Sequence, residues 1–209
     1  MKVQAAYADW SATYDEDRNL TRDLDQQVTE MILGGLRCNS ILEFGCGTGK
    51  NTALLARVGG QVRALDFSAE MIAKARQKVA SANVTFELAD ITQPWPVSDE
   101  SVELVVCNLI LEHVENLSFV FAEAARVLAP QGQFFISELH PFRQYQGVVA
   151  NFRRNDERTE IPAFIHHLSD FLDAAGAMHF QLVHLKESWH AEDENKPPRL
   201  ISFLFKKSE

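Results

Sequence analysis

The stretch SILEFGCGTGKNT, residues 40–52, places the strongest constraint on the fold. Its apolar start has the composition of a short buried strand, and three glycines follow at alternate positions, Gly45, Gly47 and Gly49. The next segment, TALLARV, has the composition of a helix. A glycine turn between strand and helix lets the backbone approach a ligand where a Cβ would collide, and it directs N–H groups of the helix start to the same place. The stretch therefore predicts a strand, a tight turn and a helix beside a ligand site.

Two common phosphate-binding loops fit this stretch poorly. A P-loop needs a glycine at the position of Phe44, and Asn51 stands where it needs a Ser or Thr hydroxyl. The dinucleotide fingerprint G-x-G-x-x-G needs its third glycine at position 50, where the chain has Lys50. A P-loop is therefore excluded, and a dinucleotide site is weakened but stays an alternative.

The rest of the chain alternates short apolar runs with amphipathic segments, which is typical of strands joined by crossover helices. Strands are predicted at 40–44, 62–66, 84–88, 102–107 and 133–137, and helices at 68–81, 116–128 and 168–178. Two more β-rich runs follow at 179–189 and 199–207, joined only by a loop, so they are expected to pair antiparallel. The predicted fold class is α/β, a doubly wound and mostly parallel Rossmann-like sheet.

Composition indicates where in the cell the protein is located and whether it has a metal site. The 209 residues suffice for one domain with a full core, and no window approaches the roughly 18 apolar residues of a membrane span. The first residues lack the apolar segment of a signal peptide, so we expect a cytoplasmic protein. The three cysteines, Cys38, Cys46 and Cys107, have no CxxC spacing, so neither a disulfide framework nor a metal site is expected.

Net charge limits the partners. A formal charge of −9 disfavours a nucleic-acid partner, because such binding draws most of its affinity from basic side chains on phosphates. We therefore expect a small-molecule partner, no nucleic acid and no membrane. Nothing in the pattern decides between a monomer and a homodimer.

Polar residues recur where the predicted parallel strands end. Glu43 precedes the glycine turn, Asp66 ends the second strand, Asp90 follows the third and Asn108 follows the fourth. Open parallel sheets bind ligands at this edge, and carboxylates there can accept hydrogen bonds from ribose hydroxyls and an exocyclic amine. Glu43 would repel a phosphate but tolerate a cation. The pattern predicts a site for an adenosine that carries a positive charge.

The motifs ILEFGCGTG, ALDFSAEMIAKAR, ELAD, DESVELVVCNLILEHVEN and EAARVLAPQGQFFISE, in this order, resemble those of class I S-adenosylmethionine-dependent methyltransferases of the small-molecule type 11 group. The resemblance covers about residues 40–138 and implies a seven-stranded sheet with an antiparallel last strand. It also implies the cofactor S-adenosylmethionine, with S-adenosylhomocysteine as its product. The cofactor-binding residues expected from it and from the strand ends are Glu43, Gly45, Cys46, Gly47, Asp66, Phe67, Met71, Asp90, Ile91, Asn108 and Tyr14.

The resemblance and the residue pattern together divide one domain into four parts. We expect lid helices at 1–39, a cofactor-binding core at 40–138, a substrate-covering insertion at 139–170, and a C-terminal helix with a β-hairpin at 171–209. Tyr7, Tyr14 and Arg18 are candidate lid residues, because YADWSATYDEDR resembles the lead helix of this group.

The insertion is rich in histidine and aromatic residues, so substrate chemistry is expected there. His140, two residues after Glu138, is the candidate general base, because an imidazole can take a proton near neutral pH. The candidate substrate residues are Arg143, Tyr145, His166 and His113.

The predicted function is methyl transfer from S-adenosylmethionine to O, N or C of a small molecule. Two alternatives stay open: a regulatory module that binds the cofactor without catalysis, and an NAD-dependent oxidoreductase. A nucleic-acid methyltransferase is disfavoured, because the segment that starts at Asn108 reads NLIL and lacks the Asn-Pro-Pro-aromatic run.

Overall fold

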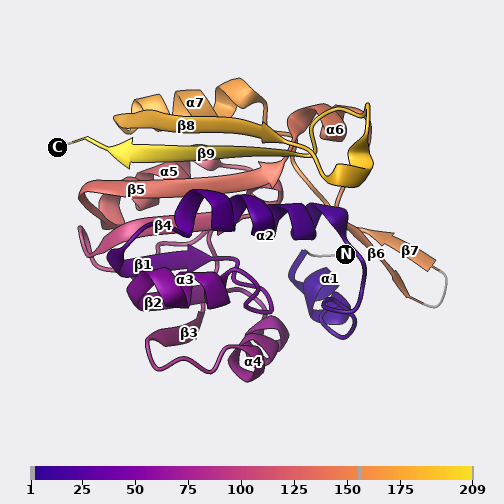
Figure 1. Cartoon of the computed structure of the whole chain (residues 1–209), viewed down its shortest axis with the longest axis horizontal. Coiled ribbons are helices and arrows are strands. Elements are labelled where there is room, and N and C mark those ends of the chain that lie inside the picture. Colours follow the sequence, from indigo (N-terminus) through magenta and orange to yellow (C-terminus); the bar gives the residue numbers. More distant parts are fainter. Residues whose placement is uncertain (1–2, 155–156, 209) are drawn as a thin grey trace.

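The computed structural model describes residues 3–154 and 157–208, and its centre is one seven-stranded sheet (Figure 1). The strand order is β3-β2-β1-β4-β5-β9-β8. The strands are β1 (Cys38–Phe44), β2 (Gly59–Asp66), β3 (Val84–Leu88), β4 (Val102–Asn108), β5 (Leu128–Leu139), β8 (Phe180–Ser188) and β9 (Leu200–Lys207). The first five strands pair in parallel, and β9 runs antiparallel to both β5 and β8. This confirms the predicted Rossmann-like sheet with an antiparallel last strand.

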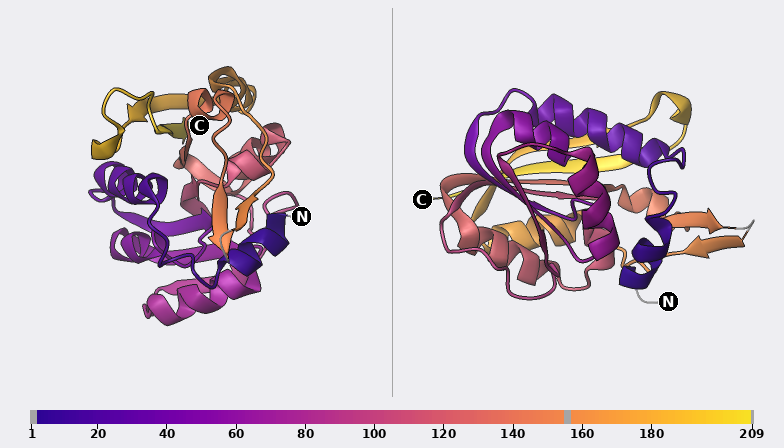
Figure 2. Two further views of the ribbon diagram at one scale, coloured as in Figure 1. Left: turned by 90° about the vertical axis from the view of Figure 1, so that its right-hand side faces the viewer. Right: turned by 90° about the horizontal axis from the view of Figure 1, so that it is seen from below.

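Helices cover both faces of the sheet (Figures 1 and 2). The described helices are α1 (Val3–Trp10), α2 (Leu20–Leu33), α3 (Thr52–Val58), α4 (Ala69–Lys78), α5 (Leu117–Val127), α6 (Pro141–Tyr145) and α7 (Leu168–Ala177), with 3-10 turns η1 (Leu111–His113) and η2 (Ala191–Asp193). Residues of α2 and α3 form one apolar core with the sheet, and residues of α5 and α7 form the other. Among the described helices, none combines the length and the apolar character needed to cross a bilayer.

The alternation of side chains along each strand explains the two cores. In β1, Ile41 packs into the core under α2 and α3, and the next residue, Leu42, packs into the core under α5 and α7. Successive strand side chains point to opposite faces, so a strand covered on both faces needs consecutive apolar residues. The short apolar runs in the sequence are therefore strands that are buried on both sides.

Predicted element bounds differ from the observed ones mainly at the ends. Ser68 caps α4 as predicted, because its Oγ accepts a hydrogen bond from Met71 N at 3.2 Å, but the helix ends at Lys78 and not at residue 81. Strand β5 was expected at 133–137 and spans Leu128–Leu139. Its polar start, Ala-Pro-Gln-Gly, has no strand pattern, and the pairing of Val102 with Leu128 across an irregularity places it in the sheet.

A third apolar cluster lies beyond the carboxyl ends of the parallel strands. A hairpin of β6 (Asn151–Arg154) and β7 (Glu157–Glu160) packs beside α1 there (Figures 1 and 2). The rings of Trp10 and Phe152 stack with centroids 5.5 Å apart and planes 14° apart. The N-terminal segment and the insertion, far apart in sequence, therefore form one cap over this edge of the sheet.

Candidate functional site

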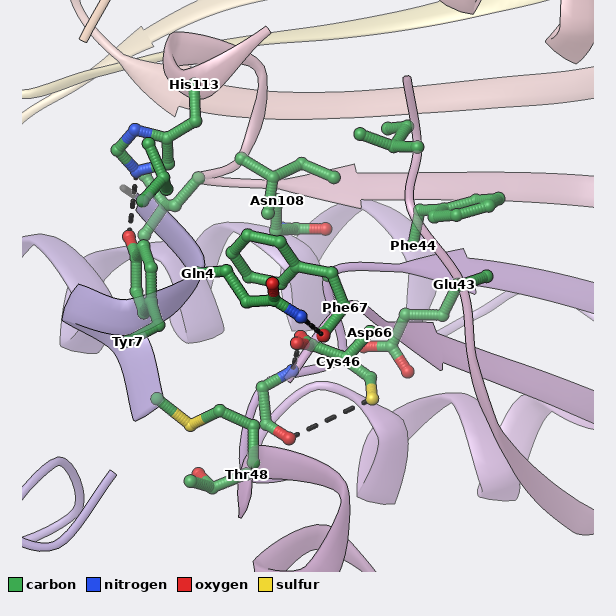
Figure 3. A pocket seen from close by; sticks show the side chains of 18 of the residues that line it. Gln4, Tyr7, Glu43, Phe44, Cys46, Thr48, Asp66, Phe67, Asn108 and His113 are labelled. Atoms are coloured by element: carbon green, nitrogen blue, oxygen red, sulfur yellow. Dashed lines mark hydrogen bonds between the residues drawn. The ribbon is translucent and has the colours of Figure 1, made fainter. Parts of the chain in front are cut away.

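A cavity of about 640 Å³ lies at the carboxyl ends of β1 to β4, under α1 (Figure 3). The last residues of four parallel strands line it, as the sequence predicts for a ligand site of this fold. It is also lined by every residue that the sequence predicts to bind the cofactor: Glu43, Gly45, Cys46, Gly47, Asp66, Phe67, Met71, Asp90, Ile91, Asn108 and Tyr14. The local sequence motifs therefore converge on one cavity.

The glycine turn after β1 forms one wall of this cavity. Gly45 and Gly47 have φ angles of 72° and 52°, in the left-handed region that favours glycine. A Cβ on Gly45 would lie 2.2 Å from Ile110 Cγ2, whereas a Cβ on Gly47 would meet nothing within 4 Å. Gly45 is therefore required by packing, and Gly47 leaves open space at the cavity wall for a ligand.

Two carboxyl groups lie beside this turn. Asp66 Oδ2 accepts a hydrogen bond from Gly47 N at 2.9 Å, and its Oδ1 accepts one from Ser68 N at 2.9 Å. Burial raises the pKa of Asp66 to about 6, although these backbone hydrogen bonds oppose the shift. Burial likewise raises the pKa of Glu43 to about 8, and Glu43 shares a 2.6 Å hydrogen bond with Thr52 Oγ1. A cation placed between these groups would stabilise their ionised forms.

An amide network joins α2 to the strand ends. Asp25 Oδ2 accepts from Asn51 Nδ2 at 2.8 Å, and its Oδ1 accepts from Asn108 Nδ2 at 2.7 Å. Asn108 Nδ2 also lies 2.8 Å from Thr29 Oγ1. The Oδ1 atoms of Asn51 and Asn108 are buried without a hydrogen-bond partner in the described structure. Buried acceptors are normally satisfied, so these two cavity-lining residues have capacity for a donor from a ligand.

The N-terminal segment closes the cavity from above. Gln4 Nε2 donates to Phe67 O at 2.6 Å, and Asp15 Oδ1 accepts from Thr48 Oγ1 at 2.7 Å and from Lys78 Nζ at 3.0 Å. These bonds fasten the segment to residues of the cavity wall and of α4. The N-terminal segment therefore borders the cavity, and its role as a lid stays a prediction.

Three tyrosine and arginine residues were candidates for this lid. Tyr7 and Tyr14 line the cavity, and the Arg22 guanidinium stacks on the Tyr14 ring at 3.9 Å. Arg18 does not line it, because its side chain pairs with Glu192 instead. The lid role of Arg18 stays a prediction.

His113 is the one substrate candidate at the cavity among the described residues. Its Nε2 lies 2.9 Å from Tyr7 Oη, and its Nδ1 lies 2.9 Å from the Pro162 carbonyl (Figure 3). Burial lowers the pKa of His113, and the Pro162 hydrogen bond opposes that shift. The imidazole is therefore held neutral, with its orientation fixed at both nitrogens.

His140, the candidate general base, does not line this cavity. Its Nδ1 accepts a hydrogen bond from Phe142 N at 3.1 Å, which caps α6, and its Nε2 lies 3.0 Å from Glu187 Oε1. Both ring nitrogens are used in capping and pairing. The structure therefore places His140 outside this cavity, and its role as a general base stays a prediction.

Arg143 also lies away from the cavity and is buried. Its guanidinium donates to Pro198 O at 3.1 Å and Pro197 O at 2.8 Å, and it pairs with the buried Asp193 at 3.0 Å. These contacts hold the loop before β9. The contacts of Arg143 thus anchor this loop, and its role in substrate binding stays a prediction.

Tyr145 and His166 are likewise absent from the cavity wall. Tyr145 Oη lies 2.7 Å from His167 Nδ1, and His166 Nε2 lies 2.7 Å from Val114 O. The second bond ties the segment after β7 to the cavity-lining loop after β4. His166 thus supports the cavity wall through Val114, and the substrate roles of Tyr145 and His166 stay predictions.

Sequence reasoning missed Gln4, Asp25 and Thr48, which also line the cavity. Asp25 is buried in the middle of α2, where a carboxylate needs hydrogen-bond donors. Asn108 at the end of β4 and Asn51 before α3 provide them, and both are distant from Asp25 in the sequence. Thr48 lies inside the glycine turn, so its position was the one available signal.

Comparison with known proteins agrees with the geometry. A family model described as a methyltransferase domain matches residues 42–136. The demethylmenaquinone methyltransferase of Tropheryma whipplei is 31% identical over 165 residues, which are 78% of this chain and 65% of that protein. The ubiquinone biosynthesis O-methyltransferase of Xanthomonas oryzae pv. oryzae is 29% identical over 154 residues, 73% of this chain and 63% of that protein. The chain thus spans less than two thirds of the length of these relatives.

Solved structures show the same fold. The N-methyltransferase NodS of Bradyrhizobium japonicum, in complex with S-adenosyl-L-homocysteine, superposes with a TM-score of 0.76 and 17% identity over 100% of both chains. An S-adenosylmethionine-dependent methyltransferase of Mesorhizobium loti gives a TM-score of 0.70 and 21% identity, covering 90% of this chain and 98% of that one. At this identity the likeness concerns the fold.

Proposed function

We propose that the chain is a class I S-adenosylmethionine-dependent methyltransferase that transfers a methyl group from S-adenosylmethionine to a small-molecule acceptor, and the methyltransferase-domain model that matches residues 42–136 supports this proposal. The observation that carries the proposal is the acidic cradle at the ends of β1 and β2, formed by the glycine turn with Glu43 and Asp66. Such a cradle suits a cationic thioether nucleoside, which would stabilise the ionised forms of both carboxyl groups, and the ionised Asp66 would repel a diphosphate.

The residues present fit this cofactor. Gly47 leaves open space at the cavity wall, and the cavity-lining Asn108 has a buried Oδ1 atom that lacks a donor. In the proposal, Asp66 accepts from the ribose hydroxyls, which is the usual role of a carboxylate after the second strand. Asn108 lies near the sulfonium. The turn Gly45-Cys46-Gly47 holds the methionine part, and Tyr14 and Glu43 complete this side of the site.

The adenine part is assigned to the other side of Asp66. Phe67 and Met71 flank the ring, and Asp90 and Ile91 meet its amino edge. Asp90 Oδ1 already accepts hydrogen bonds from the Thr92 backbone N at 2.9 Å and its hydroxyl at 2.7 Å, which fixes the loop after β3. All four residues line the cavity, which supports the assignment.

The bound cofactor supplies a methyl group on a positively charged sulfur, which is an activated leaving group. The chain then has to align the acceptor with the methyl and keep water out, and such alignment alone can lower the barrier by about 7 to 11 kcal/mol. The α1 lid, fastened by Gln4 and Asp15, supports the exclusion of water.

The proposal includes a small-molecule acceptor, a cytoplasmic location and no nucleic-acid partner. A net charge of −9 supports the last point, because a polyanion would be repelled. The names of the relatives, which refer to demethylmenaquinone and ubiquinone biosynthesis, support a small acceptor.

Calorimetry with S-adenosylmethionine, S-adenosylhomocysteine and NAD tests the cofactor. Micromolar binding of the first two and none of NAD is expected, and binding of NAD alone would favour the oxidoreductase alternative. Incubation with methyl-labelled cofactor and a small-molecule extract of the source cells then tests catalysis. Binding without any transfer of label would favour the regulatory alternative.

A further inference from the structure

Tyr7 and His113 form a hydrogen-bonded pair on the cavity wall, across from Glu43 and Cys46 (Figure 3). Tyr7 comes from α1, and His113 ends η1, 106 positions later. The ring centroids of the two residues are 5.4 Å apart with an edge-to-face angle of 73°. His113 lies in the connection that starts at Asn108, and both residues line the cavity.

The contacts fix which ring nitrogen of His113 is basic. Nδ1 lies 2.9 Å from the Pro162 carbonyl, which can only accept a hydrogen bond. Nδ1 therefore carries the hydrogen, and Nε2 has the free electron pair. Tyr7 then donates its hydroxyl hydrogen to Nε2 across 2.9 Å. The basic nitrogen belongs to a cavity-lining residue, and a hydroxyl already occupies the place of a proton donor.

The groups packed around the pair keep both members neutral. Burial lowers the pKa of His113 and raises that of Tyr7 well above its ordinary value. Glu112 Oε1 on η1 lies 3.8 Å from His113 Nε2, and burial raises the pKa of Glu112 to about 7. Behind them lies Glu138 of β5, whose pKa burial raises well above its ordinary value, and His166 bonds to the Val114 carbonyl. If His113 took up a proton during the reaction, its positive charge would lie beside the carboxyl group of Glu112.

We infer that His113 Nε2 accepts the proton of a neutral phenolic hydroxyl on the methyl acceptor, and that Tyr7 holds the imidazole in place until that hydroxyl replaces its own. The inference rests on the proposed function and names its acceptor class. The methyl–sulfur bond breaks as a methyl–oxygen bond forms, the phenolic proton moves to Nε2, and the sulfur leaves as a neutral thioether. His113 would be the catalytic residue and Tyr7 a positioning residue.

The charge of the cavity favours a neutral acceptor over a carboxylate. Asp25, Glu43, Asp66 and Asp90 all line it. Among the described lining residues, only Arg22 and Lys50 carry a permanent positive charge. Both terminal nitrogens of Arg22 donate to backbone carbonyls, and Lys50 pairs with Asp23 at 2.8 Å. An anionic acceptor would compete with these partners, and of the Arg22 nitrogens only Nε lacks a hydrogen-bond partner in the described structure.

Acidity and shape favour a phenol over an aliphatic alcohol. A phenolic hydroxyl with a pKa near 10 is within reach of a neutral imidazole, whereas an aliphatic alcohol is several units weaker as an acid. Aromatic rings surround the pair, and Tyr7 lies 6.0 Å from Phe67 and 6.4 Å from Tyr14 between ring centroids. A flat aryl ring can pack against these side chains.

The chemical test identifies the methylated atom. Protein, methyl-labelled S-adenosylmethionine and a small-molecule extract of the source cells are incubated, and the product is divided in two. Alkali releases labelled methanol from a methyl ester, and boron tribromide releases labelled methyl bromide from a methyl ether, whereas N-methyl and C-methyl groups resist both reagents. We expect the label to resist alkali and to be released by boron tribromide. Release by alkali, or resistance to both reagents, would overturn the acceptor class.

The second test isolates His113. His113→Gln should lower kcat/KM about 10²- to 10⁴-fold and remove the fall in rate at acidic pH, the effect expected for a general base. Tyr7→Phe should still lose rate at acidic pH, and its kcat/KM should fall less than that of His113→Gln. His179→Gln, the matched control at an exposed position outside the cavity, should match the wild type. In ¹⁵N-histidine spectra of the S-adenosylhomocysteine complex, His113 should show a protonated Nδ1 and an unprotonated Nε2.

The outcomes separate this inference from the proposed function. If the wild type neither binds the cofactor nor transfers label, the proposed function fails. If the wild type transfers label but His113→Gln keeps its rate and its acidic limb while binding S-adenosylhomocysteine normally, only the role of His113 fails. A protonated Nε2 in the spectra would also overturn it.

Discussion

The backbone N–H of Gly47 donates a 2.9 Å hydrogen bond to Asp66 Oδ2, which ties the glycine turn after β1 to the last residue of β2. The other oxygen of Asp66 accepts from the Ser68 backbone at 2.9 Å, at the N-cap of α4. One carboxylate therefore holds the turn and the helix start that flank the cavity. The same side chain is the one assigned to the ribose, so the shape of the cradle and its affinity are linked.

Asp66→Asn should weaken the binding of S-adenosylhomocysteine about 10- to 100-fold. The amide keeps the size of the side chain but loses its charge and one acceptor for a backbone N–H, and a hydrogen bond to a charged group is worth about 1.5 to 3 kcal/mol. Calorimetry measures the change, with the exposed α7 variant Asp173→Asn as a charge-matched control. Equal affinities of wild type and Asp66→Asn would contradict the assignment.

Alanine at Gly45 and at Gly47 should have different consequences. Both positions have positive φ, so each substitution strains the backbone by about 1 to 2 kcal/mol. At Gly45 the new Cβ would also collide with Ile110, so Gly45→Ala should lower the free energy of unfolding further. At Gly47 it would enter open space, so Gly47→Ala should reduce cofactor affinity more than stability. Urea unfolding and calorimetry on both variants check this, and equal stability losses would count against it.

The cradle was predictable because its signals are local. The glycine turn follows β1 directly, and Asp66 and Asp90 stand at or just after strand ends, so knowing the strands is enough to place them. In a parallel sheet the carboxyl ends meet at one edge, which brings these residues together without further information. The early start of β5 could not be predicted, because its pairing with β4 determines it and its own residues have no strand pattern.

The position of a histidine relative to the proposed site of the methyl acceptor depends on contacts between segments that are distant in sequence. His113 and His140 both follow parallel strands, and each has an acidic neighbour in sequence. What separates them is that Tyr7, 106 positions away, reaches His113, whereas Glu187, 47 positions away, reaches His140. Neither contact leaves a pattern in the sequence around the histidine. This explains why His140 was expected at the site and is absent from it.

The stability of the cofactor-free protein should fall as pH rises, in part through Glu43. Burial raises the pKa of Glu43 from 4.5 to about 8, so the folded state holds this proton more tightly than the unfolded state. The resulting stabilisation is complete below about pH 4.5 and is lost as pH rises through 8, with a slope of at most about 1.4 kcal/mol per pH unit. Urea unfolding at pH 5, 6.5 and 8 measures this dependence.

Glu43→Gln should flatten that dependence, because the amide does not titrate and can still bond to Thr52. Asp66 and Glu112 also have raised pKa values and are present in both proteins, so the difference between wild type and variant isolates Glu43. Identical slopes in the two proteins would show that Glu43 has an ordinary pKa in the fold.

Phe152→Ala should speed the release of S-adenosylhomocysteine about tenfold. Phe152 stacks on Trp10 and is buried in the cluster that joins the β6–β7 hairpin to α1, so its loss weakens the contact that holds the lid down. The hairpin belongs to a separate two-stranded sheet, so the loss of the Phe152 contact should favour lid opening more than global unfolding.

Stopped-flow tryptophan fluorescence measures the dissociation rate, and Phe142→Ala, at a half-exposed position on α6, is the size-matched control. A dissociation rate equal in Phe152→Ala, Phe142→Ala and the wild type would mean that the cap over the cavity is held by the bonds of Gln4 and Asp15 instead.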